Sequence, residues 1–212
     1  MEKYHKILTV WKRDPETNYK TLIEGEWACP EFEYLEHNTW VFTEKIDGTN
    51  IRVNWDCTEQ VRFGGRTERA QIPTFLYDKL QELFPPAKFA TLYPDTPMTL
   101  YGEGYGAKIQ KGGGNYIPDG VSFILFDVMI GGNYLERHNV EDIADKLQID
   151  VVPVHWVGPL QHGINVAENG FPSAIGSCIA EGFVMRPEVE MRNRMGHRII
   201  SKIKHKDFRG EG

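Results

Sequence analysis

The chain has 212 residues, of which 41% are hydrophobic and 25% charged, and its formal net charge is −6 at pH 7. This composition is typical of a folded protein with a hydrophobic core. No apolar run approaches the roughly 18 to 20 residues that cross a bilayer, and the N-terminus lacks the features of a secretory signal, which argues against a membrane protein or an exported one. The three cysteines lie far apart and predict neither a disulfide scaffold nor a zinc site, so a reducing cytoplasm is the simplest compartment.

The charge is distributed unevenly along the chain. Residues 181–212 hold eight Lys/Arg and five Asp/Glu, a balance of +3, which leaves −9 for the remaining residues. The overall negative charge excludes a protein coated in positive charge, but a local basic region of this kind suits nucleic-acid phosphates. A solvated surface face explains the same composition equally well.

The pattern of apolar residues predicts many short strands and few helices. No repeat or long linker divides the chain, so we expect one domain over residues 1–212, with no further domain after it. Apolar spacing predicts helices near 76–84 and 140–147, the second capped by Asn139, and the stretches 84–97 and 111–114 are expected to form loops. Strands that do not alternate regularly with helices favour an α+β fold built on antiparallel sheets. The predicted strands are 51–55, 98–103, 121–130, 151–157, 181–186 and 198–204.

The segment from Thr43 to Asn50 carries the first chemical motif, a Lys-x-Asp-Gly element where a strand runs into a turn. Alone, this motif is weak, because an Asp-Gly turn after an exposed lysine is the simpler interpretation. Its weight comes from four segments that follow it in order. They are Tyr101-Gly102-Glu103, continuing through Gly106 to Ile109-Gln110-Lys111-Gly112; Phe126-Asp127; Glu181-Gly182-Phe183-Val184; and Lys202-Ile203-Lys204.

These residue types suit phosphate chemistry. A lysine amine attacks phosphorus only when neutral, and an ordinary lysine with a pKa of about 10.4 is protonated at neutral pH. Burial and neighbouring cations would favour the neutral form of Lys45. Lys202 and Lys204 lie two residues apart, hence on one face of a strand, where they can meet phosphate charge. The alternative for this pair is a sheet edge guarded by lysines.

Together the five segments resemble the covalent nucleotidyltransferase superfamily of polynucleotide ligases and mRNA capping enzymes. Within it they are most similar to ATP-dependent RNA ligases of the phage RNA ligase 2 type, and the sequence at 109–112 favours that branch. The resemblance runs from about residue 20 to 206. It implies a nucleotidyltransferase (adenylation) domain of the ATP-grasp-like ligase and capping type, in which antiparallel sheets flanked by helices surround an ATP cleft.

The resemblance also implies a role for each matching residue. Lys45 is the nucleophile that forms a lysyl–AMP intermediate with ATP, with Lys202 and Lys204 assisting at the phosphates. Hard oxygen ligands suit Mg²⁺ or Mn²⁺. The implied metal ligands are Asp47, Glu103 and Glu181, and the implied nucleotide contacts are Glu44 toward the base, Phe126 stacked on adenine, Asn50 toward the phosphates and Glu103 near the ribose.

Each of these residues has a simpler alternative. Acids at strand ends usually face water, and an aromatic residue in an apolar strand such as Phe126 is usually core. The family arginine near the ribose is matched best by Arg66, with Arg62 as a competitor. The glycines of 111–114 match no phosphate-loop pattern, and the seven histidines show no supported metal-ligand spacing.

The implied partner is RNA, or a nicked duplex containing RNA, with a 5′-phosphate and a 3′-hydroxyl. Ligases of this type carry a further domain after the last motif, so we expect self-adenylylation by the chain alone and nucleic-acid contacts from its basic segment. Alternatives are a DNA ligase, a GTP-dependent capping guanylyltransferase or a non-catalytic nucleotide- or RNA-binding module. A phage-encoded protein acting in the host cytoplasm fits the same resemblance. The expected phosphate contacts are Arg192, Arg194, Arg198, Lys206 and Arg209.

Overall fold

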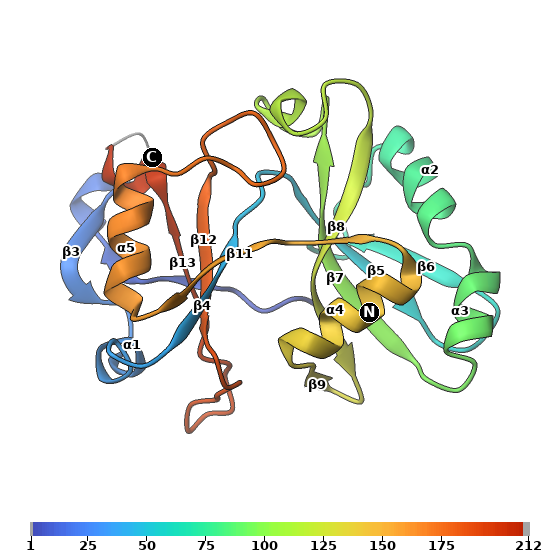
Figure 1. Ribbon diagram of the computed structural model, residues 1–212, viewed down its shortest axis with the longest axis horizontal. Coiled ribbons are helices and arrows are strands. Elements are labelled where there is room, and N and C mark those ends of the chain that lie inside the picture. Colours follow the sequence, from blue (N-terminus) through green and yellow to red (C-terminus); the bar gives the residue numbers. More distant parts are fainter. Residues whose placement is uncertain (1, 210–212) are drawn as a thin grey trace. The chain divides into compact units, whose positions relative to one another are not determined.

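The computed structural model describes residues 2–209 (Figure 1). Its internal contacts form two compact units, one made of residues 2–5 and 47–152 and the other of residues 6–46 and 153–209. Each unit has its own sheet and hydrophobic core. The prediction of one domain over the whole chain stays a prediction, because two cores can belong to one folding domain.

The first unit is built on a sheet in which β10, β8, β7, β5 and β6 lie side by side and β9 pairs with β8. Residues of β5 alternate, so that Ile51, Val53 and Trp55 face a core shared with the helices while Asn50 and Arg52 face the other side. The strands are β5 (Thr49–Trp55), β6 (Val61–Gly65), β7 (Met98–Gly106), β8 (Val121–Ile130), β9 (Asn133–Tyr134) and β10 (Asp150–Val151). The helices are α2 (Thr74–Leu83), α3 (Pro86–Leu92), α4 (Arg137–Leu147) and the short 3-10 turn η2 (Gly113–Asn115).

The second unit is built on a sheet with the order β1, β13, β12, β4, β11, beside a two-stranded ribbon of β2 and β3. The apolar face of this sheet packs against α5, which runs along β12 and β13 in Figure 1. Its strands are β1 (Leu8–Thr9), β2 (Trp11–Arg13), β3 (Leu22–Trp27), β4 (Trp40–Glu44), β11 (Val154–Gly158), β12 (Gly182–Pro187) and β13 (Ser201–Lys204). Its helices are α1 (Pro30–Tyr34) and α5 (Leu160–Asn169), with the 3-10 turns η1 (Pro15–Thr17) and η3 (His205–Phe208).

A glycine lets α5 approach the sheet. A Cβ atom added to Gly163 would lie 2.1 Å from Cε1 of Phe42, the buried aromatic residue of β4. The ring of Phe42 in turn packs against Phe183 of β12. The helix and the two central strands of this unit therefore meet around aromatic side chains, and any larger residue at 163 would push them apart.

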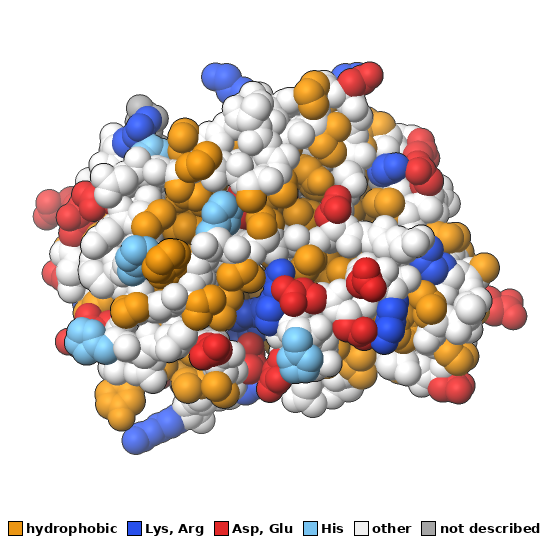
Figure 2. Space-filling model, in the orientation of Figure 1, with side chains coloured by type: hydrophobic (Ala, Val, Ile, Leu, Met, Phe, Trp, Pro, Cys, Tyr) orange, Lys and Arg blue, Asp and Glu red, His pale blue; other side chains and the backbone are white. Residues whose placement is uncertain are grey.

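Hydrophobic side chains are also visible at the surface over β11 and α5 (Figure 2). Trp156 is 49% exposed and stacks on the ring of His162 with centroids 4.5 Å apart. Across the described residues 2–209, every helix is too short or too polar to cross a membrane.

The predicted α+β fold with antiparallel sheets is confirmed, and parallel pairing is confined to β1 with β13 and β10 with β8. The prediction of a loop over 84–97 is wrong, because α3 occupies part of it. Pro86 stands at the first turn of α3, where a proline is tolerated, and Phe89 packs on Trp55. Asn139 is not a helix cap, since α4 begins at Arg137. The predicted strand 151–157 is two strands, β10 and β11, in different sheets.

Candidate active site

Lys45 follows the last residue of β4, the strand between β12 and β11. Its backbone N–H donates to the carbonyl of Gly182 at 2.9 Å, so strand pairing continues through the lysine. Thr43 lies opposite Val184, which lies opposite Lys202, and Gly182 lies opposite Lys204. Because side chains alternate along a strand, these pairings put Lys45, Lys202 and Lys204 on the same face of the sheet.

Glu181 joins two of these lysines. One carboxylate oxygen accepts a hydrogen bond from Nζ of Lys45 and the other from Nζ of Lys204, each at 2.6 Å. The three side chains are between 13% and 22% exposed. Burial alone raises the pKa of Glu181, but the two ammonium groups outweigh it and hold the pKa below its ordinary value. The carboxylate is therefore ionised at neutral pH and lies between two cations.

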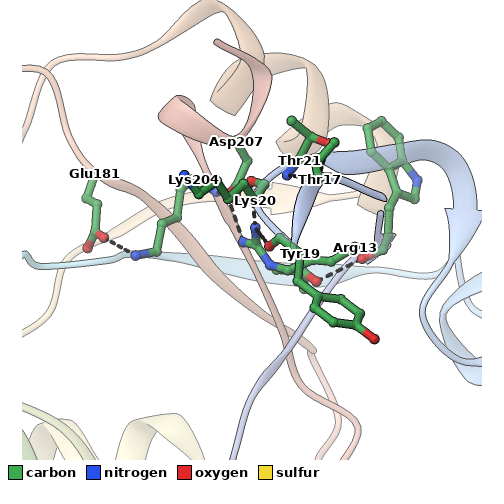
Figure 3. A network of polar contacts seen from close by, with 10 residues as sticks. Arg13, Thr17, Tyr19, Lys20, Thr21, Glu181, Lys204 and Asp207 are labelled. Atoms are coloured by element: carbon green, nitrogen blue, oxygen red, sulfur yellow. Dashed lines mark hydrogen bonds and ion pairs between the residues drawn. The ribbon is translucent and has the colours of Figure 1, made fainter. Parts of the chain in front are cut away.

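Lys204 is held from behind by a second buried acid (Figure 3). Asp207 accepts a hydrogen bond from the backbone N–H of Lys204 at 3.0 Å, and it forms an ion pair with Arg13 at 2.8 Å. Arg13 also donates to the carbonyls of Tyr19 and Lys20. These contacts fix the end of β13 against the β2–β3 ribbon, so the direction of the Lys204 side chain is set by the fold.

Glu44 has a buried carboxylate that contacts protein groups on all sides. It accepts hydrogen bonds from the Ser173 hydroxyl, from the backbone N–H of Ala174 at 2.9 Å and from Nε2 of His155 at 2.7 Å. The side chain is fully buried. The predicted contact of Glu44 with a base stays a prediction, and a contact by its carboxylate would have to share or displace these donors.

Two predicted residues of the first unit lie next to each other on the polar side of its sheet. Asn50 of β5 pairs with Glu103 of β7. Gly48 passes so close to this point that an added Cβ would lie 2.7 Å from Cγ of Glu103. Oδ1 of Asn50 is buried, and no described residue donates a hydrogen bond to it. Such an atom needs a partner, and a bound ligand can supply one.

The turn at 47–48 is held by the segment that follows β7. Nε2 of Gln110 donates to the carbonyl of Gly48 at 2.9 Å, and the hydroxyl of Tyr116 accepts from the backbone N–H of Asp47 at 3.4 Å. The residues 109–112 thus contact the Lys-x-Asp-Gly turn although some sixty positions separate them in sequence.

Phe126 is not a core residue. The pairing of β7 with β8 shifts between Tyr101 and Gly102, which lie opposite Asp127 and Leu125, so Phe126 is the extra residue of a β-bulge. Its two neighbours are buried while Phe126 is half exposed. The ring of Tyr4 meets it edge-on at 5.0 Å, and the Tyr4 hydroxyl donates to Asp127 at 2.5 Å. The bulge therefore turns one aromatic face away from the core, as a stacking role requires.

The arginines differ in what they contact. Arg62 is paired with Asp56 at 3.1 Å, whereas Arg66 is exposed directly after β6. Arg52 is fully buried and donates to the carbonyl of Gly65 and to Glu68. Arg52 therefore holds the start of the segment that carries Arg66, and the match of Arg66 to the family arginine stays a prediction.

The basic segment is less available to nucleic acid than the sequence suggested. The Arg198 side chain is only 2% exposed and is paired with Glu190, so the prediction that Arg198 contacts phosphates is wrong. The other four predicted contacts, Arg192, Arg194, Lys206 and Arg209, are exposed.

The implied metal ligands are oxygen donors of the kind that Mg²⁺ and Mn²⁺ prefer. Asp47 and Glu103 belong to the first unit and Glu181 to the second. Among residues 2–209, no three His, Cys, Asp or Glu side chains are gathered around one point as in a preformed metal centre. The carboxylate oxygens are of the type that a divalent cation prefers, and a cation at Glu181 would compete with Lys45 and Lys204 for that carboxylate.

Sequence reasoning missed the residues that support the site. His155 and Ser173 hold Glu44, Arg13 and Asp207 hold Lys204, and Tyr4 holds Asp127. Except for Asp207, which follows Lys204 by three residues, these partners are distant in sequence and no local pattern marks them. Only the sheet register brings these residues together.

Lys45, Lys202 and Lys204 lie on one face of the sheet, and Glu181 pairs with two of them at the end of the central strand β4. Such an arrangement in an α+β fold suits an anionic substrate. The family model for RNA ligases matches residues 38–204. The chain therefore belongs to the RNA ligase family. Comparison with curated protein sequences finds no match.

Solved structures of Naegleria gruberi RNA ligase have the same fold. The structure titled as the ligase with PPi is 18% identical with a TM-score of 0.70, and the match covers 98% of this chain and 57% of that one. A lysine-to-methionine variant with AMP and Mn is 16% identical with a TM-score of 0.69, at the same coverage. A lysine-to-alanine variant with ATP and Mn is 19% identical with a TM-score of 0.65, covering 84% and 54%. This chain thus spans less than two thirds of the length of these relatives.

Proposed function

We propose that the protein is an ATP-dependent RNA ligase whose Lys45 forms a covalent lysyl–AMP intermediate. The observation that carries the proposal is the cluster of Lys45, Lys202 and Lys204 on one sheet face with Glu181 between two of them. Family membership and the ATP, AMP and Mn named in the titles of the solved relatives support it. Their low identity leaves the activity of this chain to experiment.

In the first step, the neutral amine of Lys45 attacks the α-phosphorus of ATP. A nitrogen–phosphorus bond forms, the bond to the β-phosphate oxygen breaks, and pyrophosphate leaves. Lys202 and Lys204 stabilise negative charge that develops on the phosphates. The proton of Lys45 is released to solvent, because the lowered pKa of Glu181 makes that carboxylate a weak base.

We propose the remaining nucleotide contacts as the resemblance implies them, and the setting of each side chain in its own unit supports its part. Phe126 offers a half-exposed ring for the adenine, Asn50 a buried polar group, and Arg66 an exposed guanidinium. The proposed ligands for a divalent cation, which when bound neutralises phosphate charge, are Asp47 and Glu103 in the first unit and Glu181 in the second, each considered within its own unit. In the later steps, AMP passes to a 5′-phosphate of RNA, and a 3′-hydroxyl then attacks with release of AMP.

The test is incubation with ATP or GTP labelled at the α-phosphate, followed by denaturing electrophoresis. We expect label from ATP in the parent protein and none in Lys45→Ala, which lacks the amine. Lys45→Arg should also take no label, because a guanidinium stays protonated. Lys12→Ala, which removes an exposed lysine paired with Glu26, is the matched control and should retain the label. Label from GTP would indicate a capping enzyme, and no label from either nucleotide would indicate a binding module.

We further propose that the preferred substrate is a nick in duplex RNA, or in a duplex containing RNA, because a template aligns the two ends. Arg192, Arg194, Lys206 and Arg209 supply exposed positive charge, so binding should weaken steeply as salt rises. Sealing of nicked RNA is compared with joining of single strands at matched salt, with a nicked DNA duplex as a third substrate. Faster joining of single strands would contradict the nick preference, and faster sealing of DNA would indicate a DNA ligase.

A further inference from the structure

We propose that His155 and Ser173 are positioning residues for Lys45, acting through the buried carboxylate of Glu44. The inference rests on the proposed role of Lys45 as nucleophile. It concerns how the chain fixes that side chain, and it assigns a role to two residues that no sequence motif includes.

Glu44 is held by donors from separate segments of one unit. Nε2 of His155 comes from β11, while the Ser173 hydroxyl and the Ala174 backbone N–H come from the segment after α5. The Ser173 hydroxyl and the Ala174 N–H donate to the carboxylate, and Nε2 of His155 lies within hydrogen-bond distance of it. Hydrogen bonds to a charged acceptor are shorter and stronger than neutral ones. The carboxylate is therefore fixed in direction as well as buried.

The donors are themselves held in place. The ring of His155 lies edge-on to Phe171 with centroids 4.8 Å apart, and Phe171 stacks on Phe183 at 4.1 Å. The Ser173 hydroxyl also accepts from the backbone N–H groups of Ile175 and Gly176, and the Ser173 N–H donates to the carbonyl of Cys178. Aromatic rings and backbone groups thus hold the donors in place.

Glu44 and Lys45 are consecutive residues, so their side chains leave β4 on opposite faces of the sheet. Glu44 lies opposite Phe183 on the face that α5 covers, whereas Lys45 reaches Glu181 on the other face. The backbone N–H of Glu44 donates to Pro153 and that of Lys45 to Gly182. Anchoring the carboxylate on one face thus fixes the strand end from which the long Lys45 side chain extends on the other.

The neighbours of Glu44 argue against a role in stability alone. Phe42, two residues earlier on the same face, is buried, as is Phe183 opposite Glu44. An apolar residue at position 44 would pack against these rings but would leave the groups of His155, Ser173 and Ala174 without their partner, whereas a buried carboxylate carries a desolvation cost that only good hydrogen bonds offset. A carboxylate here gives direction to the strand end, which an apolar side chain does not.

The test measures single-turnover lysyl–AMP formation over a range of ATP concentrations. His155→Phe should lower the maximal rate about 100-fold, the loss expected for a misplacement near 1 Å, with the half-saturating ATP concentration unchanged within about twofold. His155→Gln keeps an N–H donor and should recover most of the rate. Ser173→Ala leaves two donors and should cost about tenfold. The control is His162→Phe, which should match the parent. His162 belongs to α5 and stacks on Trp156, a residue of the same strand as His155.

A second measurement does not need catalysis. Acetic anhydride labelling of Lys45 is compared with that of exposed Lys12 by mass spectrometry, and His155→Phe should raise the ratio at least threefold by loosening the Lys45–Glu181 pair. Folded variants with parental rates and labelling would overturn the inference. It would also be overturned if His155→Phe raised only the half-saturating ATP concentration, because that result would mark His155 as a nucleotide contact. A parent that forms no lysyl–AMP overturns the proposed function instead, and the labelling ratio then decides the positioning role.

Discussion

Replacing Glu181 by glutamine tests the electrostatics of the lysine cluster without reference to catalysis. The substitution keeps the shape of the side chain but removes the charge that lies 2.6 Å from both Lys45 and Lys204. The amide retains one acceptor oxygen, so one lysine keeps a weaker hydrogen bond and the other faces an N–H group. We expect the folded state to lose stability.

The size of the loss follows from the burial of the three side chains. Removing one partner of a fully buried ion pair costs about 3 to 5 kcal/mol, and a hydrogen bond to a charged group is worth about 1.5 to 3 kcal/mol. The lysines are 22% and 21% exposed, so water screens part of the interaction. We therefore expect a loss of about 1 to 3 kcal/mol, which in a chain of this size lowers the Tm by about 3 to 10 °C.

The pH dependence gives the sharper test. The pKa of Glu181 is lowered from 4.5, so its contribution to folding is present above that pH and is lost as the pH falls through the lowered pKa. The Tm difference between the parent and Glu181→Gln should stay constant between about pH 7 and 5 and shrink at lower pH.

Thermal denaturation followed by circular dichroism measures both effects. Glu26→Gln is the control, because its ion pair with Lys12 is 53% and 57% exposed and should contribute little. The reasoning is refuted if Glu181→Gln melts at the parental temperature at pH 7, or if the difference is as large at pH 3 as at pH 7.

Three further outcomes are expected. Lys202→Ala and Lys204→Ala should each slow lysyl–AMP formation by about 10² to 10⁴ at saturating ATP, and parental rates in both would contradict a role for the pair in this step. Gly163→Ala should lower the Tm, since overpacking against Phe42 costs about 1 to 3 kcal/mol, whereas Gly114→Ala, with open space around it, should not. Burial and Asp150 raise the pKa of Tyr105 to about 12, so the free energy of unfolding should fall as the pH rises from about 10 toward 12. A Tyr105→Phe variant that loses as much stability over this pH range in a denaturation experiment would contradict this.

The sequence predicted most of the central strands, because their apolar residues follow a strand pattern, but it missed the edge strand β6 and the helix α5. The segment 121–130 is β8 at those same limits, and the Leu76–Leu80 spacing lies in α2. It failed where prolines obscured a helix. Pro85 and Pro86 look like loop residues, yet α3 begins at Pro86. A proline is tolerated there because the N–H groups of the first turn make no hydrogen bond within the helix.

The site was predictable only as far as consecutive residues carry chemistry. The motif lysines and acids were recognised from local sequence, but the Glu190 partner of the buried Arg198 belongs to no motif, and the donors around Glu44 come from segments distant in the chain. His155 lies 111 residues from Glu44 and Ser173 lies 129 residues away. The β-bulge that turns Phe126 out of the core is likewise a property of register, which an apolar run such as Ser122–Val128 does not reveal.

The contacts that hold Lys45 also oppose its proposed chemistry. A carboxylate at 2.6 Å favours the ammonium form, whereas attack on phosphorus needs the neutral amine. Because Glu181 serves Lys45 and Lys204 together, any cation that binds this carboxylate must compete with both lysines, and its binding would weaken the force that keeps Lys45 protonated. Glu44, on the opposite face, has no part in this competition and can hold the strand end fixed while the charges around the amine change. The second unit therefore separates the two requirements of a lysine nucleophile, with position set on the buried face of the sheet and charge set on the other.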